Sequence, residues 1–184
     1  MAFIGIDPGA KGGLAMISAS GAVLNLRPTP TIAGKFNVRL FAQALKEMEA
    51  HAALHGEGID LVIIEQVGAM PGNGVTAMFS FGYGAGAIEG ILSSFQWPYQ
   101  LVRPQLWQKD FHVGTSAKLD AKARSILAAQ RLFPKESFLA SSRSTKPHDG
   151  IIDAALLAEF GRRSWRGTGA SSKAHNNLPV FEER

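Results

Sequence analysis

The sequence contains no cysteine among its 184 residues. Disulfide bonds, thiolate metal sites and cysteine nucleophiles are therefore excluded, and the composition fits a reducing compartment. No apolar run approaches the ~18 residues of a membrane span. The chain enters an apolar strand pattern by Phe3, which predicts that no signal or transit peptide precedes it. We therefore expect a cytoplasmic protein with no membrane partner.

Basic side chains are missing from the middle of the chain. Between Lys46 and Arg103 there is no lysine or arginine. Residues 1–102 hold 5 basic and 7 acidic residues, a net charge of −2, whereas residues 103–184 hold 14 and 8, a net charge of +6. A nucleic-acid-binding surface around an acidic metal site would need such a distribution. A solvated basic face with a basic tail would give the same totals.

The order of apolar patterns predicts an α/β fold. Short strands joined by glycine-rich turns indicate an antiparallel meander, and alternating strands and helices follow it. The expected strands are 3–7, 14–17, 22–26, 61–64 and 99–103, and the expected helices are about 37–55, 75–92, 116–133 and 149–163, with Ser116 as the N-cap of the third. Together they predict one domain over residues 1–165, with a mixed five-stranded sheet flanked by helices. Residues 68–74 are expected to form a loop and 166–184 a disordered tail.

Four carboxylates lie at the ends of predicted strands or near the start of a predicted helix, where the fold would bring them close together. Asp7 and Glu65 each end an apolar strand, and side chains that act lie at such strand ends in α/β sheets. Asp149 and Asp153 are four residues apart and so share a helix face. No lysine or arginine adjoins any of the four in the sequence. Crowded carboxylates repel one another, and a divalent cation is the usual compensation.

Each of these carboxylates also has a purely structural interpretation. Asp7 can start a turn by bonding its own backbone, and Glu65 can emerge into solvent at the end of its strand. The helix macrodipole would stabilise a negative charge at Asp149. Asp153 lies one turn further into the helix, where the macrodipole explains the presence of a carboxylate poorly.

Two neighbours of these carboxylates have open roles. Gly5 is expected to leave room beside Asp7 for an ion. His148 is a metal ligand, a base for an attacking water, or only a flanking polar residue.

The basic half and one aromatic segment supply candidates for DNA contact. Lysine and arginine near the last two helices would contact phosphates or form a solvated face. Aromatic side chains at the start of the second helix would stack on or wedge between bases, or belong to the core. The DNA-binding candidates are Lys118, Lys122, Arg124, Lys146, Phe79 and Phe81.

The second predicted helix is unusually rich in glycine, with Gly82, Gly84, Gly86 and Gly90. Glycine in a helix costs up to about 1 kcal/mol relative to alanine, so we infer that another backbone approaches it closely. That backbone belongs either to a second subunit or to a neighbouring helix of the same chain.

Several segments resemble those of a known family. Gly5-Ile6-Asp7-Pro8-Gly9, Ile64-Glu65-Gln66 and Asp153-Ala154-Ala155-Leu156 resemble the signature segments of RuvC-type Holliday junction resolvases, in the ribonuclease H-like superfamily. Arg103-Pro104-x-x-Trp107-Gln108 and Lys146-x-His148-Asp149-Gly150 look most like the phage/bacterial and chloroplast branch. The similarity covers about residues 3–163.

The resemblance implies a homodimer that nicks two opposed strands of a four-way DNA junction in a bacterial or phage-infected cell. By motif, the catalytic and metal-binding residues are Asp7, Glu65, Asp149 and Asp153, with His148 as an alternative to Asp149 because the last acidic pair is four apart rather than three. Two Mg²⁺ ions about 4 Å apart would activate water and stabilise the leaving oxygen, and Mn²⁺ is expected to substitute. The alternatives are a ribonuclease H-like nuclease acting on branched DNA or an RNA–DNA hybrid, and a non-catalytic DNA-binding protein of the same fold.

Overall fold

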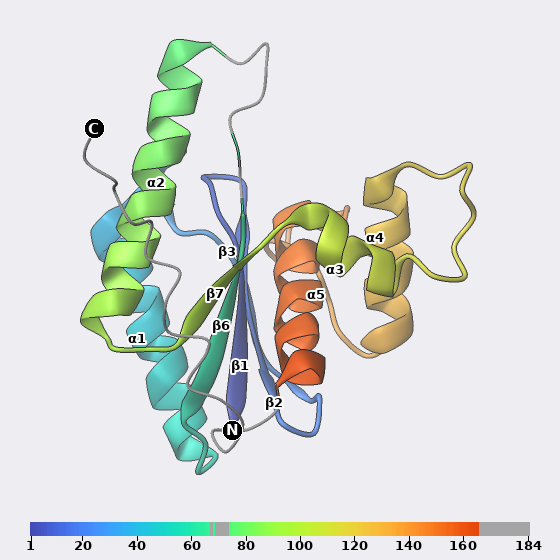
Figure 1. The fold of residues 1–184 in the computed structure, drawn as a ribbon, viewed down its shortest axis with the longest axis horizontal. Coiled ribbons are helices and arrows are strands. Elements are labelled where there is room, and N and C mark those ends of the chain that lie inside the picture. The colour runs from blue at the N-terminus through green and yellow to red at the C-terminus, as the bar shows by residue number, and fades with distance from the viewer. Residues whose placement is uncertain (67, 69–73, 166–184) are drawn as a thin grey trace, which may run out of the picture.

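A mixed five-stranded sheet forms the centre of the structure, with helices on both of its faces (Figure 1). The computed structural model describes residues 1–66, 68 and 74–165. The strands are β1 (Ala2–Asp7), β2 (Gly13–Ser18), β3 (Val23–Pro28), β6 (Ile59–Glu65) and β7 (Tyr99–Val102), in the spatial order β3-β2-β1-β6-β7. β1, β2 and β3 pair antiparallel, whereas β6 pairs parallel with both β1 and β7. The predicted fold class is confirmed.

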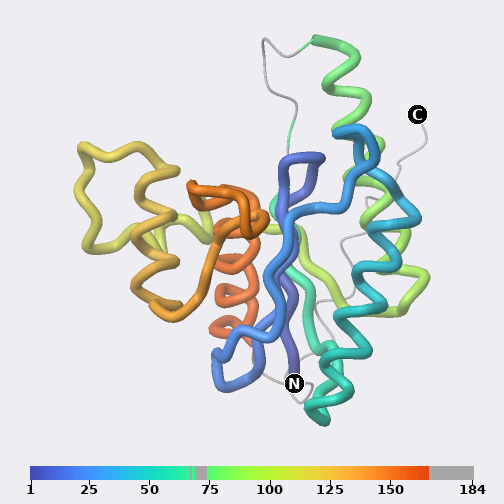
Figure 2. Tube along the Cα trace, turned by 180° about the vertical axis from the view of Figure 1, so that it is seen from behind, coloured from blue at the N-terminus to red at the C-terminus, as the bar shows by residue number. Residues whose placement is uncertain are grey.

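Five helices cover the sheet. They are α1 (Val38–Leu54), α2 (Val75–Ser94), α3 (Pro104–Phe111), α4 (Ala121–Leu132) and α5 (Asp149–Ser164). α1 and α2 lie on one face, and α5 lies on the other with α3 and α4 outside it (Figures 1 and 2). A small hairpin of β4 (Thr31–Ile32) and β5 (Lys35–Phe36) precedes α1. Neither α3 nor this hairpin was expected from the sequence.

The start of α4 was predicted wrongly. Asp120 rather than Ser116 is its N-cap, and the Asp120 carboxylate accepts a hydrogen bond from the Ala123 N–H at 2.7 Å. Both residue types cap helices well, so the sequence alone does not choose between them. Most of the predicted loop over 68–74, and the predicted tail over 166–184, lie outside the described residues.

Strand alternation divides the core into two layers. Odd-numbered residues of β1 and β6, such as Phe3 and Ile63, pack with α5 and α3. Even-numbered residues, such as Ile4 and Val62, pack with α1 and α2. Successive side chains on a strand point to opposite faces, so the odd-numbered Asp7 and Glu65 belong to the α5 side.

At Gly5, α5 lies directly against β1, with no side chain between the two backbones. A Cβ atom on Gly5 would overlap the backbone of Ala154 and Ala158. At the start of α5, the backbones of Gly12 and Gly150 meet in a parallel bridge. The prediction that Gly5 leaves room for an ion is therefore wrong, because the α5 backbone fills that space.

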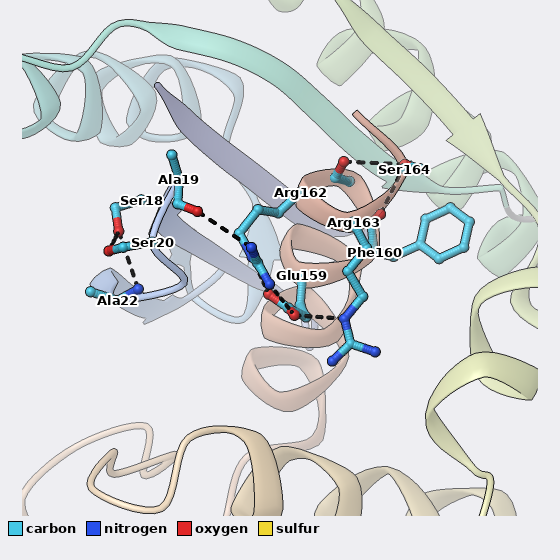
Figure 3. Close-up of polar contacts among 10 residues, drawn as sticks. Ser18, Ala19, Ser20, Ala22, Glu159, Phe160, Arg162, Arg163 and Ser164 are labelled. Carbon is cyan, nitrogen blue, oxygen red and sulfur yellow. Dashed lines mark hydrogen bonds and ion pairs between the residues drawn. The ribbon is translucent and has the colours of Figure 1, made fainter. Parts of the chain in front are cut away.

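The far end of α5 is fixed by ion pairs between two arginines and one buried carboxylate (Figure 3). Glu159 is only 3% exposed. Arg162 donates to its carboxylate from Nε at 2.7 Å and Nη2 at 2.8 Å, and Arg163 donates from Nε at 2.7 Å. Arg162 also donates from Nη1 to the Ala19 carbonyl at 3.3 Å, which joins α5 to the turn between β2 and β3. α5 is thus held at both ends.

By length and composition alone, α2 could cross a membrane. It has 20 residues, and 22% of its most apolar window is buried. One such helix is weak evidence for a membrane, and the absence of a membrane partner stays a prediction. The result does show that the described part of the chain leaves much apolar surface of α2 uncovered.

We expect Gly5→Ala to lower the free energy of unfolding by at least about 3 kcal/mol, because the added methyl group would push α5 off β1. Urea denaturation followed by circular dichroism measures the change. Gly58→Ala is the matched control, since a Cβ atom there meets nothing within 4 Å. Equal stability of the two variants would contradict the direct packing of α5 on β1.

Candidate active site

Four carboxylates from three elements gather at one end of the sheet. Asp7 ends β1 and Glu65 ends the neighbouring parallel strand β6. Asp149 and Asp153 lie on the first turns of α5, which starts at the same end of the sheet (Figure 1). All four side chains are half-buried. The structure thus brings together the residues that the sequence singled out.

Asp7, Glu65, Asp149 and Asp153 form an acidic cluster, and burial raises the pKa of three of its members. Burial, with the nearby charges of Glu65, Asp153 and Asp149, raises the pKa of Asp7 to about 8. Burial and the charges of Glu65 and Asp149 likewise raise the pKa of Asp153 to about 7. Burial also raises the pKa of Glu65. Without a cation, therefore, Asp7 is mostly protonated at neutral pH.

One member of the acidic cluster has a basic partner. Lys122 of α4 forms an ion pair with Asp149 through Nζ and Oδ2, and this contact raises the pKa of Lys122. The sequence showed no basic neighbour because the lysine lies 27 positions earlier and reaches Asp149 only through the packing of α4 on α5. The other oxygen, Asp149 Oδ1, is buried and has no hydrogen-bond partner among the described residues.

Polar groups on α3 and α4 support two further members of the cluster. The indole Nε1 of Trp107 donates to Glu65 Oε1 at 3.1 Å. The nearby Ser125 hydroxyl opposes the rise in the pKa of Asp153. Ser125 in turn lies 3.2 Å from Nε2 of the buried His112. No role was predicted for these three residues from the sequence. Only Trp107 could have been found there, because it lies in a segment that resembles RuvC-type resolvases.

His148 has a structural role in the observed arrangement. It is the N-cap of α5, and its Nδ1 accepts a hydrogen bond from the Ile151 N–H at 3.3 Å. The sequence left three roles open for His148, namely metal ligand, base for an attacking water and flanking polar residue. This contact favours the last of the three.

The acidic cluster suits a hard divalent cation by donor chemistry. Carboxylate oxygens are the ligands that Mg²⁺ and Mn²⁺ prefer, and the buried Asp149 Oδ1 has no hydrogen-bond partner among the described residues. Within residues 1–66, 68 and 74–165, however, no three His, Asp or Glu side chains lie close enough to hold one ion as they stand. Binding a cation would thus require some of these side chains to move closer together.

Comparison with solved structures identifies the fold. The chain matches Thermus thermophilus RuvC in complex with a Holliday junction substrate, with a TM-score of 0.55 and 17% identity over 89% of this chain and 95% of that one. The chain has the RuvC fold. A second Thermus thermophilus RuvC structure matches with the same TM-score and identity, over 89% of this chain and 96% of that one. No protein-family model and no curated protein sequence matches the chain.

On this RuvC fold, the basic candidates divide into exposed and engaged side chains. Lys118 and Lys146 are exposed. Arg124 is half-buried and donates to Thr115 Oγ1 at 2.8 Å and to the His112 carbonyl at 3.3 Å. Its contacts hold the segment before α4, whereas the two exposed lysines are free to reach a phosphate.

The two aromatic candidates on α2 have different surroundings. Phe79 is 76% exposed. Phe81 is half-buried, and its ring lies 3.7 Å from the position of a Cβ atom on Gly9, in the turn that follows Asp7. Phe81 therefore packs beside the acidic cluster, whereas Phe79 is directed into solvent.

We expect Asp7→Asn to stabilise the cation-free protein by an amount that grows with pH. Folding raises the pKa of Asp7 from 3.8 to about 8. The folded state binds this proton more tightly than the unfolded chain, so stability falls as pH rises between those values, by on the order of a few kcal/mol. Urea denaturation in chelator at about pH 5 and about pH 9 measures the difference between the variant and the wild type. The exposed Asp110→Asn is the control, and a difference that does not vary with pH would contradict the raised pKa.

Proposed function

We propose that the protein is a metal-dependent endonuclease that resolves four-way DNA junctions by paired nicks. The observation that carries this proposal is the gathering of four half-buried carboxylates at one end of a sheet that has the RuvC fold. A RuvC structure of this fold is in complex with a Holliday junction substrate, which supports the same class of DNA for this chain. A non-catalytic DNA-binding protein would gain nothing from keeping these carboxylates, whose repulsion costs folding energy.

Asp7, Glu65, Asp149 and Asp153 are the residues that would hold two magnesium ions. When bound, magnesium or manganese lowers the pKa of water and stabilises negative charge on a phosphodiester. Asp7 and Asp153, whose pKa values burial and repulsion raise, would hold the ions in their ionised forms. Lys122, which pairs with Asp149 Oδ2, would be available for a DNA phosphate if that contact were released.

The basic surface near the acidic cluster would position the DNA. Lys118 and Lys146 are exposed, and they belong to the half of the chain with a net charge of +6. Phosphate contacts of this kind fix the position of DNA without reading its sequence. We assign Lys118, Lys122 and Lys146 to the phosphates, and the exposed ring of Phe79 to stacking on bases where the junction opens.

We also propose that the protein is a homodimer formed through α2. Val75, Phe79 and Tyr83, spaced four apart, are 87%, 76% and 57% exposed. A Cβ atom on Gly82, Gly86 or Gly90 would meet nothing within 4 Å, and on Gly84 only the Phe36 ring. The alternative that these glycines admit a helix of the same subunit is therefore wrong for the described part of the chain. A twofold axis on α2 would supply two active sites, one for each opposed strand.

We expect Asp7→Asn, Glu65→Gln and Asp153→Asn each to reduce junction cleavage to below about a tenth of the wild-type rate, because each removes a cation ligand. Junction affinity should be retained or improved, since each variant also removes negative charge facing the DNA. Cleavage of an immobile four-way junction, a linear duplex and an RNA–DNA hybrid, with and without Mg²⁺, measures activity, and mobility shift measures binding.

Asp110→Asn is the control for these variants and should cleave like the wild type. Cleavage of the hybrid but not of the junction would replace the proposal with a ribonuclease H-like activity. Full activity of Asp7→Asn would exclude the acidic cluster as the catalytic site.

We expect Gly86→Leu to convert a dimer to a monomer without loss of helix content, because the added side chain projects from the uncovered face of α2. Sedimentation at micromolar concentration measures assembly, and circular dichroism measures folding. Ala53→Leu, on the exposed surface of α1, is the control and should leave the dimer intact. A wild-type monomer with full junction activity would rule out the dimer.

A further inference from the structure

We propose that Trp107 is a positioning residue, whose indole N–H holds one oxygen of Glu65 so that the other stays available to a divalent cation. This inference rests on the proposed function in that it takes Glu65 to be a cation ligand. The contact joins two elements that are far apart in the sequence. Trp107 lies on α3, and Glu65, 42 positions earlier, ends β6.

The indole is rigidly held. Trp107 is 0% exposed and belongs to the core layer formed by α5, α3 and the odd-numbered residues of the sheet. Its neighbour along the same helix face, Phe111, is also buried there. A ring packed on all sides cannot rotate its N–H away, so the 3.1 Å bond to Glu65 Oε1 fixes the orientation of the carboxylate.

The chemistry of the donor suits this role better than a charged side chain would. An indole has a single N–H donor and no charge, so it binds one carboxylate oxygen and leaves the negative charge in place for a cation. Among the described residues, no other group donates a hydrogen bond to this carboxylate.

A simpler explanation is that Glu65 serves Trp107, by satisfying a buried N–H. The two explanations differ in what Trp107→Phe would change. If Glu65 only satisfies the indole, removing the N–H alters stability and leaves cation affinity as it was. If Trp107 positions Glu65, the variant loses cation affinity, and groups that orient metal ligands typically contribute about 10–100-fold.

The first test is calorimetric titration of the cation-free protein with Mn²⁺ alone, without DNA. We expect Trp107→Phe to weaken binding by about 10–100-fold. Trp97→Phe is the matched control, because Trp97 is 8% exposed in the opposite core layer with α1 and α2. In a Glu65→Gln background, Trp107→Phe should cause no further loss. Wild-type affinity in Trp107→Phe, or an additive loss in the double variant, would overturn the inference.

The second test does not depend on the folding of Trp107→Phe. The chain has three tryptophans, so Trp97→Phe together with Trp165→Phe leaves Trp107 as the sole indole. Titration with Mg²⁺ should shift its fluorescence emission, and Glu65→Gln should abolish the shift. An emission that Mg²⁺ leaves unchanged would overturn the inference.

Failure of the inference and failure of the proposed function give different results. If Mn²⁺ affinity depends on Trp107 and Glu65 but the protein cuts no junction, the positioning role is supported and the junction-resolving function is wrong. If the protein cuts junctions and Trp107→Phe binds Mn²⁺ as tightly as the wild type, the proposed function is supported and the positioning role is wrong.

Discussion

The direct contact between β1 and α5 is the constraint on which the rest of the structure depends. Gly5 has no side chain, so the helix backbone touches the strand, and Gly12 and Gly150 repeat this contact at the start of α5. Each glycine costs roughly 0.5–1 kcal/mol of intrinsic propensity, which the close packing must offset. The result is that the first turn of α5 can stand beside the end of β1 and complete the acidic cluster.

The acidic cluster shows two ways of managing crowded negative charge. At Asp149, an ion pair with the nearby Lys122 compensates the negative charge of the carboxylate. At Asp7, burial and repulsion raise the pKa until the carboxyl keeps its proton. Both arrangements are reversible in principle, because a bound cation would compete with the proton on Asp7 and with the exposed lysine at Asp149. Neither exchange would require the fold around the site to change.

The sequence predicted most of the fold because long apolar patterns carry strong periodicity. The strands ending in Asp7 and Glu65 were expected from such runs, and so were all helices except α3. α3 was missed because it has eight residues, of which only Trp107 and Phe111 are buried. The same limit applies to the site. The four carboxylates could be found because each ends or starts an apolar run, whereas the partners Lys122 and Trp107 reach them only through tertiary packing.

The face of β1 that carries Phe3 is covered by α5, a helix from the far end of the described chain. Until residues 149–164 have been synthesised, Phe3 and Ile63 have no α5 to cover them. Contacts between such distant segments slow folding and leave an incomplete chain prone to aggregation. The same order delays assembly of the acidic cluster, because two of its members arrive with α5. In a nascent chain, the acidic cluster would thus stay incomplete until the residues of α5 have been synthesised.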